Sequence, residues 1–197
     1  RIVAVCFALV TLSFPILAAA AVSVVVDPLY GIDNLACNIT NPCKTIAFAS
    51  QQRGASVLLL RGVFNETTVY LSSAAFLNIS GSAAASAALF DCSSRAGPAF
   101  SITNSTIAIS SVTFINCRNQ GVRGGAVNAT NSSISLWNCT FANNSAVSGG
   151  ALSLNLGTLA IRACSFVGNS AGCPFFPNVN STCSSWGGAI AAFETAH

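Results

Sequence analysis

The feature that most constrains the fold of this chain is an internal repeat in its second half. Three segments align with one another, and they begin at Ser111, Cys139 and Cys164. Each segment carries a phenylalanine close to its start, and Phe114, Phe141 and Phe166 lie 27 and 25 residues apart. A unit of this size cannot bury its own apolar face, whereas a stack of such units can. The repeat therefore predicts a solenoid.

Short alternating stretches within each repeat predict β-strands. In Ala126–Ala129 and Ser133–Trp137, apolar and polar side chains alternate, so that one set of side chains points inward. Three double glycines precede such stretches and permit a tight backbone turn; they are Gly124-Gly125, Gly149-Gly150 and Gly187-Gly188. Only 7% of the residues are charged, and the many Ser, Thr and Asn residues disfavour helices. We expect an all-β fold, a right-handed parallel β-helix solenoid.

Stacked coils about 4.8 Å apart place equivalent residues directly above one another. An aromatic ladder is expected inside the solenoid, made of Phe90, Phe114, Phe141 and Phe166. Asn144 and Asn169 each follow their phenylalanine by three residues. We therefore expect these two asparagines to form a short ladder of their own at a turn.

The segment before the repeats, residues 22–55, predicts a first strand and a capping helix. Val22–Val26 is rich in valine and is followed by Asp27-Pro28, so it predicts the strand. A second buried strand is expected over Val57–Leu60, and the coils then fill residues 56–197.

A short helix is expected between these two strands. Asn41 followed by Pro42 is typical of an N-cap and a first helical position, and Gly54 is a stop signal. The helix is therefore predicted over Pro42–Gln52. A solenoid needs a cover over its open end, and this helix is expected to supply it.

The first residues predict a segment that directs export. Arg1 is followed by an uncharged stretch that continues to Val26, with small residues at 18–21. A short basic flank, an apolar stretch and small residues at its end are typical of a secretory signal peptide, which we place at residues 1–21. The alternative is an uncleaved membrane anchor, because the stretch is long enough to span a bilayer, although Pro15 interrupts it.

The cysteines also indicate an oxidising compartment. Of nine cysteines, Cys6 lies in the predicted signal peptide and the other eight form an even set. We predict four disulfides, Cys37–Cys43, Cys92–Cys117, Cys139–Cys164 and Cys173–Cys183. The alternative for the four cysteines near the phenylalanine ladder is buried free thiols. No two cysteines have C-x-x-C spacing and the one histidine is His197, so we expect no metal and no other cofactor.

Nine asparagines begin an N-x-S/T sequon, which marks them as candidate N-glycosylation sites. They are Asn38, Asn65, Asn78, Asn104, Asn128, Asn131, Asn138, Asn143 and Asn180. This number favours a glycosylated protein of a eukaryotic secretory route. An alternative explanation accounts for part of this excess of sequons, because the turns of a β-helix are rich in Asn, Ser and Thr in any case.

The charged residues argue against two classes of function. The eight basic residues are scattered, whereas a nucleic-acid-binding face needs them clustered. The acidic residues are Asp27, Asp33, Glu66, Asp91 and Glu194. Glycoside hydrolases use paired carboxylates, and lyases need a base beside an Arg or Lys. Only Asp91 has such a neighbour, Arg95, and a surface ion pair is the simpler explanation, so we expect no catalytic site.

Several motifs, taken in their order, resemble known β-helix families. D-P-x-x-G at 27–31, P-C-K-T-I-A at 42–47 and R-G-V-F at 61–64 resemble the opening segment of the pectin-lyase-like right-handed parallel β-helix superfamily. The later F-x-x-N and G-G-A-[I/L/V] elements resemble the repeats of chlamydial polymorphic outer-membrane proteins and their eukaryotic look-alikes. Cys117 departs from this pattern, because it stands where asparagine is expected. The resemblance covers nearly all of the chain after the signal peptide and implies a surface adhesin or a carbohydrate-related β-helix protein.

We therefore expect a non-catalytic domain, secreted or at the cell surface, that binds an extracellular glycan or protein. The candidate ligand-binding residues are Trp137, Trp186, Phe175 and Phe176. The last three flank or lie in the insertion between Cys173 and Cys183, and ordinary packing of that insertion is the alternative explanation. A second, weaker set could line an anionic-glycan groove, and it consists of Arg95, Arg118 and Arg123. Scattered solubilising charge is the alternative there.

Two other functions stay open as alternatives. One is a polysaccharide lyase or hydrolase whose active site lies outside this sequence, and the other is a structural wall or surface-coat protein. The sequence ends at His197, shortly after a G-G-A-I element opens a new coil, so we expect the coils to be C-terminally incomplete. Membrane attachment is expected only through an uncleaved N-terminal segment or a C-terminal anchor beyond this sequence.

Overall fold

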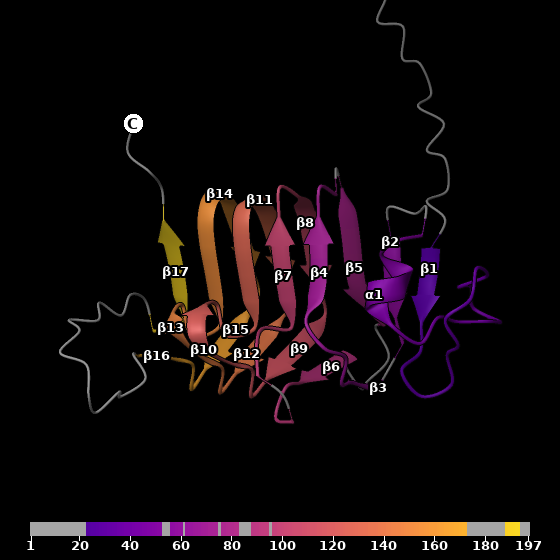
Figure 1. Cartoon of the computed structure of the whole chain (residues 1–197), viewed down its shortest axis with the longest axis horizontal. Coiled ribbons are helices and arrows are strands. Elements are labelled where there is room, and N and C mark those ends of the chain that lie inside the picture. Colours follow the sequence, from indigo (N-terminus) through magenta and orange to yellow (C-terminus); the bar gives the residue numbers. More distant parts are fainter. Residues whose placement is uncertain are drawn as a thin grey trace, which may run out of the picture.

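The computed structural model of the chain is a parallel β-helix, as predicted. It describes residues 23–52, 56–60, 62–74, 76–82, 88–94, 96–172 and 188–193. The strands stack along one axis, with β1 (Ser23–Val26) at one end and β14 (Leu152–Arg162) and β17 (Ile190–Phe193) toward the other (Figure 1). Each recorded strand pairing is parallel, from the first pair of the stack to the last.

Each full coil passes through four flat faces, which we name A, B, C and D. Face A holds β4 (Val69–Ser72), β7 (Phe100–Thr103), the first halves of β11 (Val127–Trp137) and β14, and β17. Face B holds β1, β2 (Ser56–Leu59), β5 (Leu77–Gly81), β8 (Thr106–Ser110) and the second halves of β11 and β14.

Faces C and D complete each coil. Face C holds β3 (Gly62–Phe64), β6 (Ala88–Asp91), β9 (Val112–Ile115), β12 (Thr140–Ala142) and β15 (Ser165–Val167). Face D holds β10 (Arg118–Arg123), β13 (Ser145–Ser148) and β16 (Ser170–Ala171). Pairing on face D shifts register between Asn119 and Arg123, so this face is the least regular of the four.

Single residues with a left-handed backbone make the corners between faces. At the A–B corner they are Ser73, Asn104, Asn131 and Leu156, at the B–C corner Ser111, Asn138 and Ala163, and at the C–D corner Asn116, Asn143 and Gly168. Their φ values lie between +48° and +63°, a region that Gly and Asn adopt most easily. One such residue turns the chain and leaves both flanking stretches paired.

The corner geometry corrects one expectation about strand boundaries. Ala126–Ala129 and Ser133–Trp137 were predicted as separate strands, but Val127–Ala129 and Ser133–Trp137 belong to the single strand β11, which bends at Asn131. Because Thr130 and Ser132 keep their partners in β14, the hydrogen-bond ladder continues through the bend.

The predicted aromatic ladder fills the core, and it begins one coil earlier than expected. Phe64, Phe90, Phe114, Phe141 and Phe166 stack with ring centroids 4.9 to 5.2 Å apart and interplanar angles of 2° to 22°. Offset stacking at this distance is a favourable aromatic geometry. Phe64 was missed because the R-G-V-F stretch was assigned to the opening of the fold rather than to the ladder. Its ring is fully buried, as are those of Phe90, Phe114 and Phe141.

The predicted asparagine ladder is also confirmed. Asn144 is fully buried, and its Oδ1 accepts a hydrogen bond from the Cys117 backbone N–H at 2.9 Å. Its Nδ2 donates to the Phe114 carbonyl at 3.1 Å and to Asn169 Oδ1 at 3.0 Å. Asn169 Nδ2 donates in turn to the Phe141 carbonyl at 2.9 Å. The amides thus satisfy backbone groups at the C–D corner, where the ladder of strand hydrogen bonds is interrupted.

The capping helix is present but much shorter than predicted. It is α1 (Ile46–Ala49), with Thr45 rather than Asn41 as its N-cap, and Thr45 Oγ1 accepts from the Phe48 N–H at 3.2 Å. The predicted start at Pro42 is wrong because Cys43 is held extended: its N–H and carbonyl bond to Val25 and Asp27, beside β1. The helix contacts β1 and β4 and buries Ile46 and Ala49 at the N-terminal end of the stack.

Candidate functional site

Two of the four predicted disulfides are present. Cys37–Cys43 closes the loop between β1 and α1, with the two Cα atoms 4.7 Å apart. Cys92–Cys117 joins neighbouring coils at the C–D corner, with the two Cα atoms 4.6 Å apart. The predicted Cys173–Cys183 bond lies outside the described residues.

The predicted Cys139–Cys164 disulfide is wrong for this structure, because both residues are free thiols. The two cysteines do occupy neighbouring coils, and Cys164 Sγ accepts from the Cys139 backbone N–H at 3.4 Å. Cys139 Sγ, however, donates to the carbonyls of Ile109 and Trp137, and Cys164 Sγ donates to that of Arg162. Both thiols thus donate to backbone oxygens, and they form no disulfide with each other. Burial raises the pKa of Cys139 to about 11.

The carboxylates serve as caps for backbone N–H groups. Asp27 binds the first turn after β1, and Asp33 and Glu66 bind N–H groups around the start of α1. Asp91 Oδ1 accepts from the Ser93 hydroxyl and from the Ser93 N–H at 3.0 Å, and these bonds lower the pKa of Asp91 below its ordinary value. Each described carboxylate therefore has a structural role in a turn or at the helix start. Arg95, the predicted neighbour of Asp91, lies outside the described residues.

The sequon asparagines fall into two structural groups. Asn104, Asn131, Asn138 and Asn143 are exposed corner residues with positive φ. Asn78 and Asn128 lie within strands and are half-buried, whereas Asn38 and Asn65 are exposed in loops. Asn180 lies outside the described residues. Glycosylation itself stays a prediction, and corner geometry accounts for the asparagine at four of the nine positions.

The most distinctive surface feature is a hollow on the outer side of face B, which we call the Trp137 hollow. It has a volume of about 570 Å³. Its lining comes from four neighbouring strands: Asn78, Ala108, Ile109, Ser110, Ser135, Leu136, Trp137, Ala160, Ile161 and Arg162. Trp137 is 59% exposed, and its register partners in the adjacent strands are Ser110 and Arg162.

Small side chains make this part of face B low and flat. Ala108, Ser135 and Ala160 are register partners in β8, β11 and β14. In each strand they lie two residues before the row that contains Trp137 and Arg162, so both rows point outward. A bulky indole therefore rises beside a shelf of methyl and hydroxyl groups. None of the four strands that line the hollow carries a carboxylate, and Arg162 has no acidic partner among the described residues.

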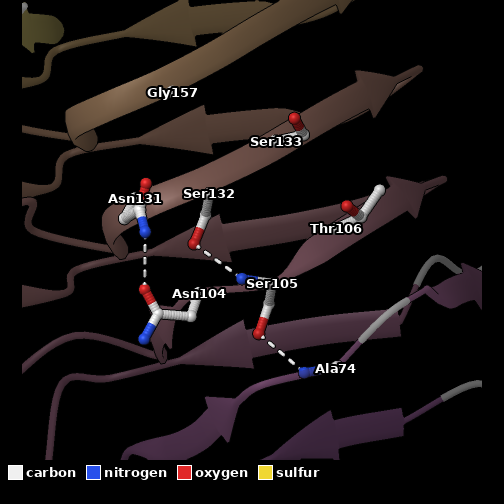
Figure 2. Close-up of a pocket in the computed structure, with 8 residues that line it drawn as sticks. All are labelled: Ala74, Asn104, Ser105, Thr106, Asn131, Ser132, Ser133 and Gly157. Carbon is white, nitrogen blue, oxygen red and sulfur yellow. Dashed lines mark hydrogen bonds between the residues drawn. The ribbon is translucent and has the colours of Figure 1, made fainter.

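A second hollow lies at the A–B corner, and we call it the corner hollow (Figure 2). It has a volume of about 340 Å³ and is lined by Ala74, Asn104, Ser105, Thr106, Asn131, Ser132, Ser133 and Gly157. Asn131 Nδ2 donates to Asn104 Oδ1 at 2.8 Å, and no other described residue bonds to Asn104 Nδ2 or to Asn131 Oδ1. Figure 2 shows these two groups at opposite ends of the amide pair.

Buried serines hold the floor of the corner hollow in place. Ser105 Oγ donates to the Thr103 carbonyl and accepts from the Ala74 N–H, at 2.8 and 3.0 Å. Ser132 repeats this arrangement one coil later, because its Oγ donates to the Thr130 carbonyl and accepts from the Ser105 N–H. All these groups are used within the protein, so only the outer amides and hydroxyls are left to meet a ligand.

Of the predicted ligand-binding residues, the structure places Trp137 in a hollow. Trp186, Phe175 and Phe176 lie outside the described residues. Arg118 and Arg123 are both exposed on face D, and the Arg123 guanidinium lies 4.2 Å from the centre of the Phe193 ring. Arg95 lies outside the described residues, so the arginine groove stays a prediction, and the Arg123 cation already packs on an aromatic ring.

Two sets of surface residues were missed by sequence reasoning. Arg162 lies 25 residues after Trp137, which is one repeat, so the repeat itself was a signal that could have found it. The loop between β1 and α1 exposes five large apolar side chains, Leu29, Tyr30, Ile32, Leu35 and Ile39. No periodic pattern marks these five residues, and the Cys37–Cys43 bond and the Asp33 carboxylate hold their loop in an ordered conformation.

Comparison with known proteins gives no match: no protein-family model, no curated protein and no solved structure matches this chain. Within the described part of the chain, no helix is long and apolar enough to cross a membrane. Over the same residues, no three His, Cys, Asp or Glu side chains gather in a way that could hold a metal ion.

Proposed function

We propose that this chain is a non-catalytic extracellular or cell-surface domain that binds glycans on the outer side of face B. The observation that carries the proposal is the exposed indole of Trp137, which lines a hollow with small side chains and the Arg162 cation. Pyranose rings have apolar C–H faces and polar hydroxyl edges. An indole ring can stack on the apolar face of the sugar, and serine, asparagine and arginine side chains can form hydrogen bonds with its hydroxyl groups.

Two further observations support an extracellular setting. Disulfides persist mainly in oxidising compartments, and Cys37–Cys43 and Cys92–Cys117 are bonded. The order of the D-P-x-x-G, F-x-x-N and G-G-A motifs resembles the pectin-lyase-like superfamily and the polymorphic outer-membrane proteins, and a relation to them is part of this proposal. Such families place β-helices at surfaces or on carbohydrates, which agrees with a glycan-binding role.

Glycan binding by the purified full chain tests the proposal. Wild-type protein is applied to an array of immobilised oligosaccharides, together with Trp137→Ala and the matched control Tyr70→Ala. Tyr70 is also a well-exposed aromatic residue, at 76% against 59% for Trp137, but it lies on face A. Loss of Trp137 is expected to weaken binding at least about tenfold, or about 1.4 kcal/mol, and loss of Tyr70 to leave it unchanged. Failure of the folded wild type to bind any glycan would instead favour a structural coat.

A further inference from the structure

The Trp137 hollow and the corner hollow lie on the same strands. Thr106 and Ser133 line the corner hollow, and Ala108 and Ser135 line the Trp137 hollow. In β8 and in β11 these residues are two positions apart, so their side chains project from the same side of face B. The two hollows are therefore consecutive along the strands.

On β8, β11 and β14 the outward residues between the two hollows are all small. At the edge of the corner hollow, Ser133 Oγ and Thr158 Oγ1 share a hydrogen bond of 2.7 Å that ties β11 to β14. The next outward row is Ala108, Ser135 and Ala160. Ser135 and Ala160 are exposed, so the floor between the hollows is low and open to solvent.

The two ends of this surface differ in chemistry. At one end Trp137 offers a flat apolar ring and Arg162 a cation. At the other end the Asn104–Asn131 pair presents the Asn104 amide nitrogen and the Asn131 carbonyl oxygen, to which no other described residue bonds. One end can stack on a ring, and the other can donate to and accept from hydroxyl groups.

We propose that the two hollows form one trough, in which an oligosaccharide lies parallel to β11 and perpendicular to the axis along which the coils stack. One ring stacks on Trp137, and hydroxyls of a more distant unit bond to Asn104 and Asn131. The four steps along β11 from Ser133 to Trp137 alone span about 13 Å, which is longer than a single sugar ring. This inference rests on the proposed glycan-binding function and deepens it by fixing the ligand's length and direction.

Calorimetric titration of the full chain with sugars of two lengths tests the trough. The probes are cellobiose and cellotetraose, with digalacturonate and tetragalacturonate as the acidic counterparts. β-1,4-linked glucose has an apolar face on every ring, and the acidic pair reports whether Arg162 favours a carboxylate. The tetrasaccharide of at least one series is expected to bind at least tenfold more tightly than its disaccharide.

Two variants probe the middle and the far end of the trough. Ser135→Phe is expected to block it and weaken tetrasaccharide binding at least tenfold, and Ser101→Phe, on the outer side of face A, serves as the matched control. Asn104→Gly, which suits the positive φ, is expected to weaken tetrasaccharide binding and to leave disaccharide binding unchanged. Asn138→Gly at the B–C corner, also at positive φ, is its control. Circular dichroism verifies that each variant is folded.

The outcomes separate this inference from the function on which it rests. Binding that depends on Trp137 but is unaffected by Ser135→Phe and Asn104→Gly would overturn the trough and keep the proposed function. Wild-type protein that binds none of the four sugars would overturn both. A glycan found by mass spectrometry on Asn104 or Asn131 of the natural protein would also overturn the trough, because it would occupy the corner hollow.

Discussion

Replacing Asn144 by alanine is expected to destabilise the solenoid strongly, because this buried side chain connects three coils. Its amide bonds to the Cys117 N–H and the Phe114 carbonyl on one side and to Asn169 on the other. Alanine would leave the N–H and the carbonyl without this partner in a dry environment. Each such loss costs about 1–3 kcal/mol, so the expected total is about 2–6 kcal/mol. That is a large part of the 5–15 kcal/mol by which domains are typically stable.

Asn143→Gly is the matched control for this prediction. Asn143 is the preceding residue at the same corner, it is exposed, and its φ of +54° suits glycine. We expect that variant to stay within about 1 kcal/mol of the wild type. Urea unfolding followed by circular dichroism measures both, and a shifted midpoint with an unchanged slope reports a change in stability. An Asn144→Ala loss no larger than that of Asn143→Gly would refute the role of the ladder.

Three further predictions concern the reactivity of the two free thiols, the stability of the protein in acid and the substitution of glycines in turns. Cys164 is expected to react with iodoacetamide much faster than Cys139, whose pKa is raised to about 11 by burial, and peptide mapping that found both protected would indicate a disulfide instead. The lowered pKa of Asp91 predicts a contribution to stability that is complete above the carboxyl's unfolded pKa and is lost as the pH falls through the folded pKa. Asp91→Asn should therefore weaken the dependence of the melting temperature on pH in acid, and an identical dependence would argue against it. Gly149→Ala should lower the free energy of unfolding by more than about 2 kcal/mol, because φ is +60° and the added Cβ would lie 2.1 Å from the Leu152 carbonyl oxygen. Gly172→Ala is the control, because its Cβ would meet nothing within 4 Å. Equal melting temperatures of the two variants would contradict this reasoning.

The core of the fold was predictable because stacking turns sequence period into spatial contact. Phe114, Phe141 and Phe166 recur once per repeat, and in a parallel solenoid residues at equal positions must meet. The same logic found the Asn144–Asn169 pair. These predictions needed no knowledge of side-chain orientation beyond the alternation of a strand.

The wrong predictions, the helix start and one disulfide, depend on contacts that cannot be inferred from the repeat period. The predicted helix start rested on the local preferences of Asn41 and Pro42. In the structure, pairing of Cys43 with Val26 keeps the chain extended as far as Thr45. The Cys139–Cys164 bond was inferred from stacking alone, yet nearby carbonyls accept from both thiols. In each case a tertiary contact outweighed a local or positional rule.

The site was predictable only in part, for a similar reason. Trp137 follows the inward-facing Ile134 and Leu136, so alternation alone places it outside the solenoid. The hollow beside it depends on which small residues the neighbouring coils supply, such as Ala108 and Ala160. That arrangement follows from the register between coils, and the length of each corner fixes this register.

The corner sequons show how solenoid geometry can produce a motif that usually signals glycosylation. A corner asparagine adopts positive φ, the next residue points into the core, and the third begins the following strand with its side chain outward. Asn104-Ser105-Thr106 and Asn138-Cys139-Thr140 both follow this order, with Ser105 and Cys139 buried. An outward position at the start of a strand favours Thr or Ser, so N-x-S/T arises without any selection for a glycan. The sequon count is therefore weak evidence for the secretory route, and the loop sequons at Asn38 and Asn65, which no corner explains, are the informative ones.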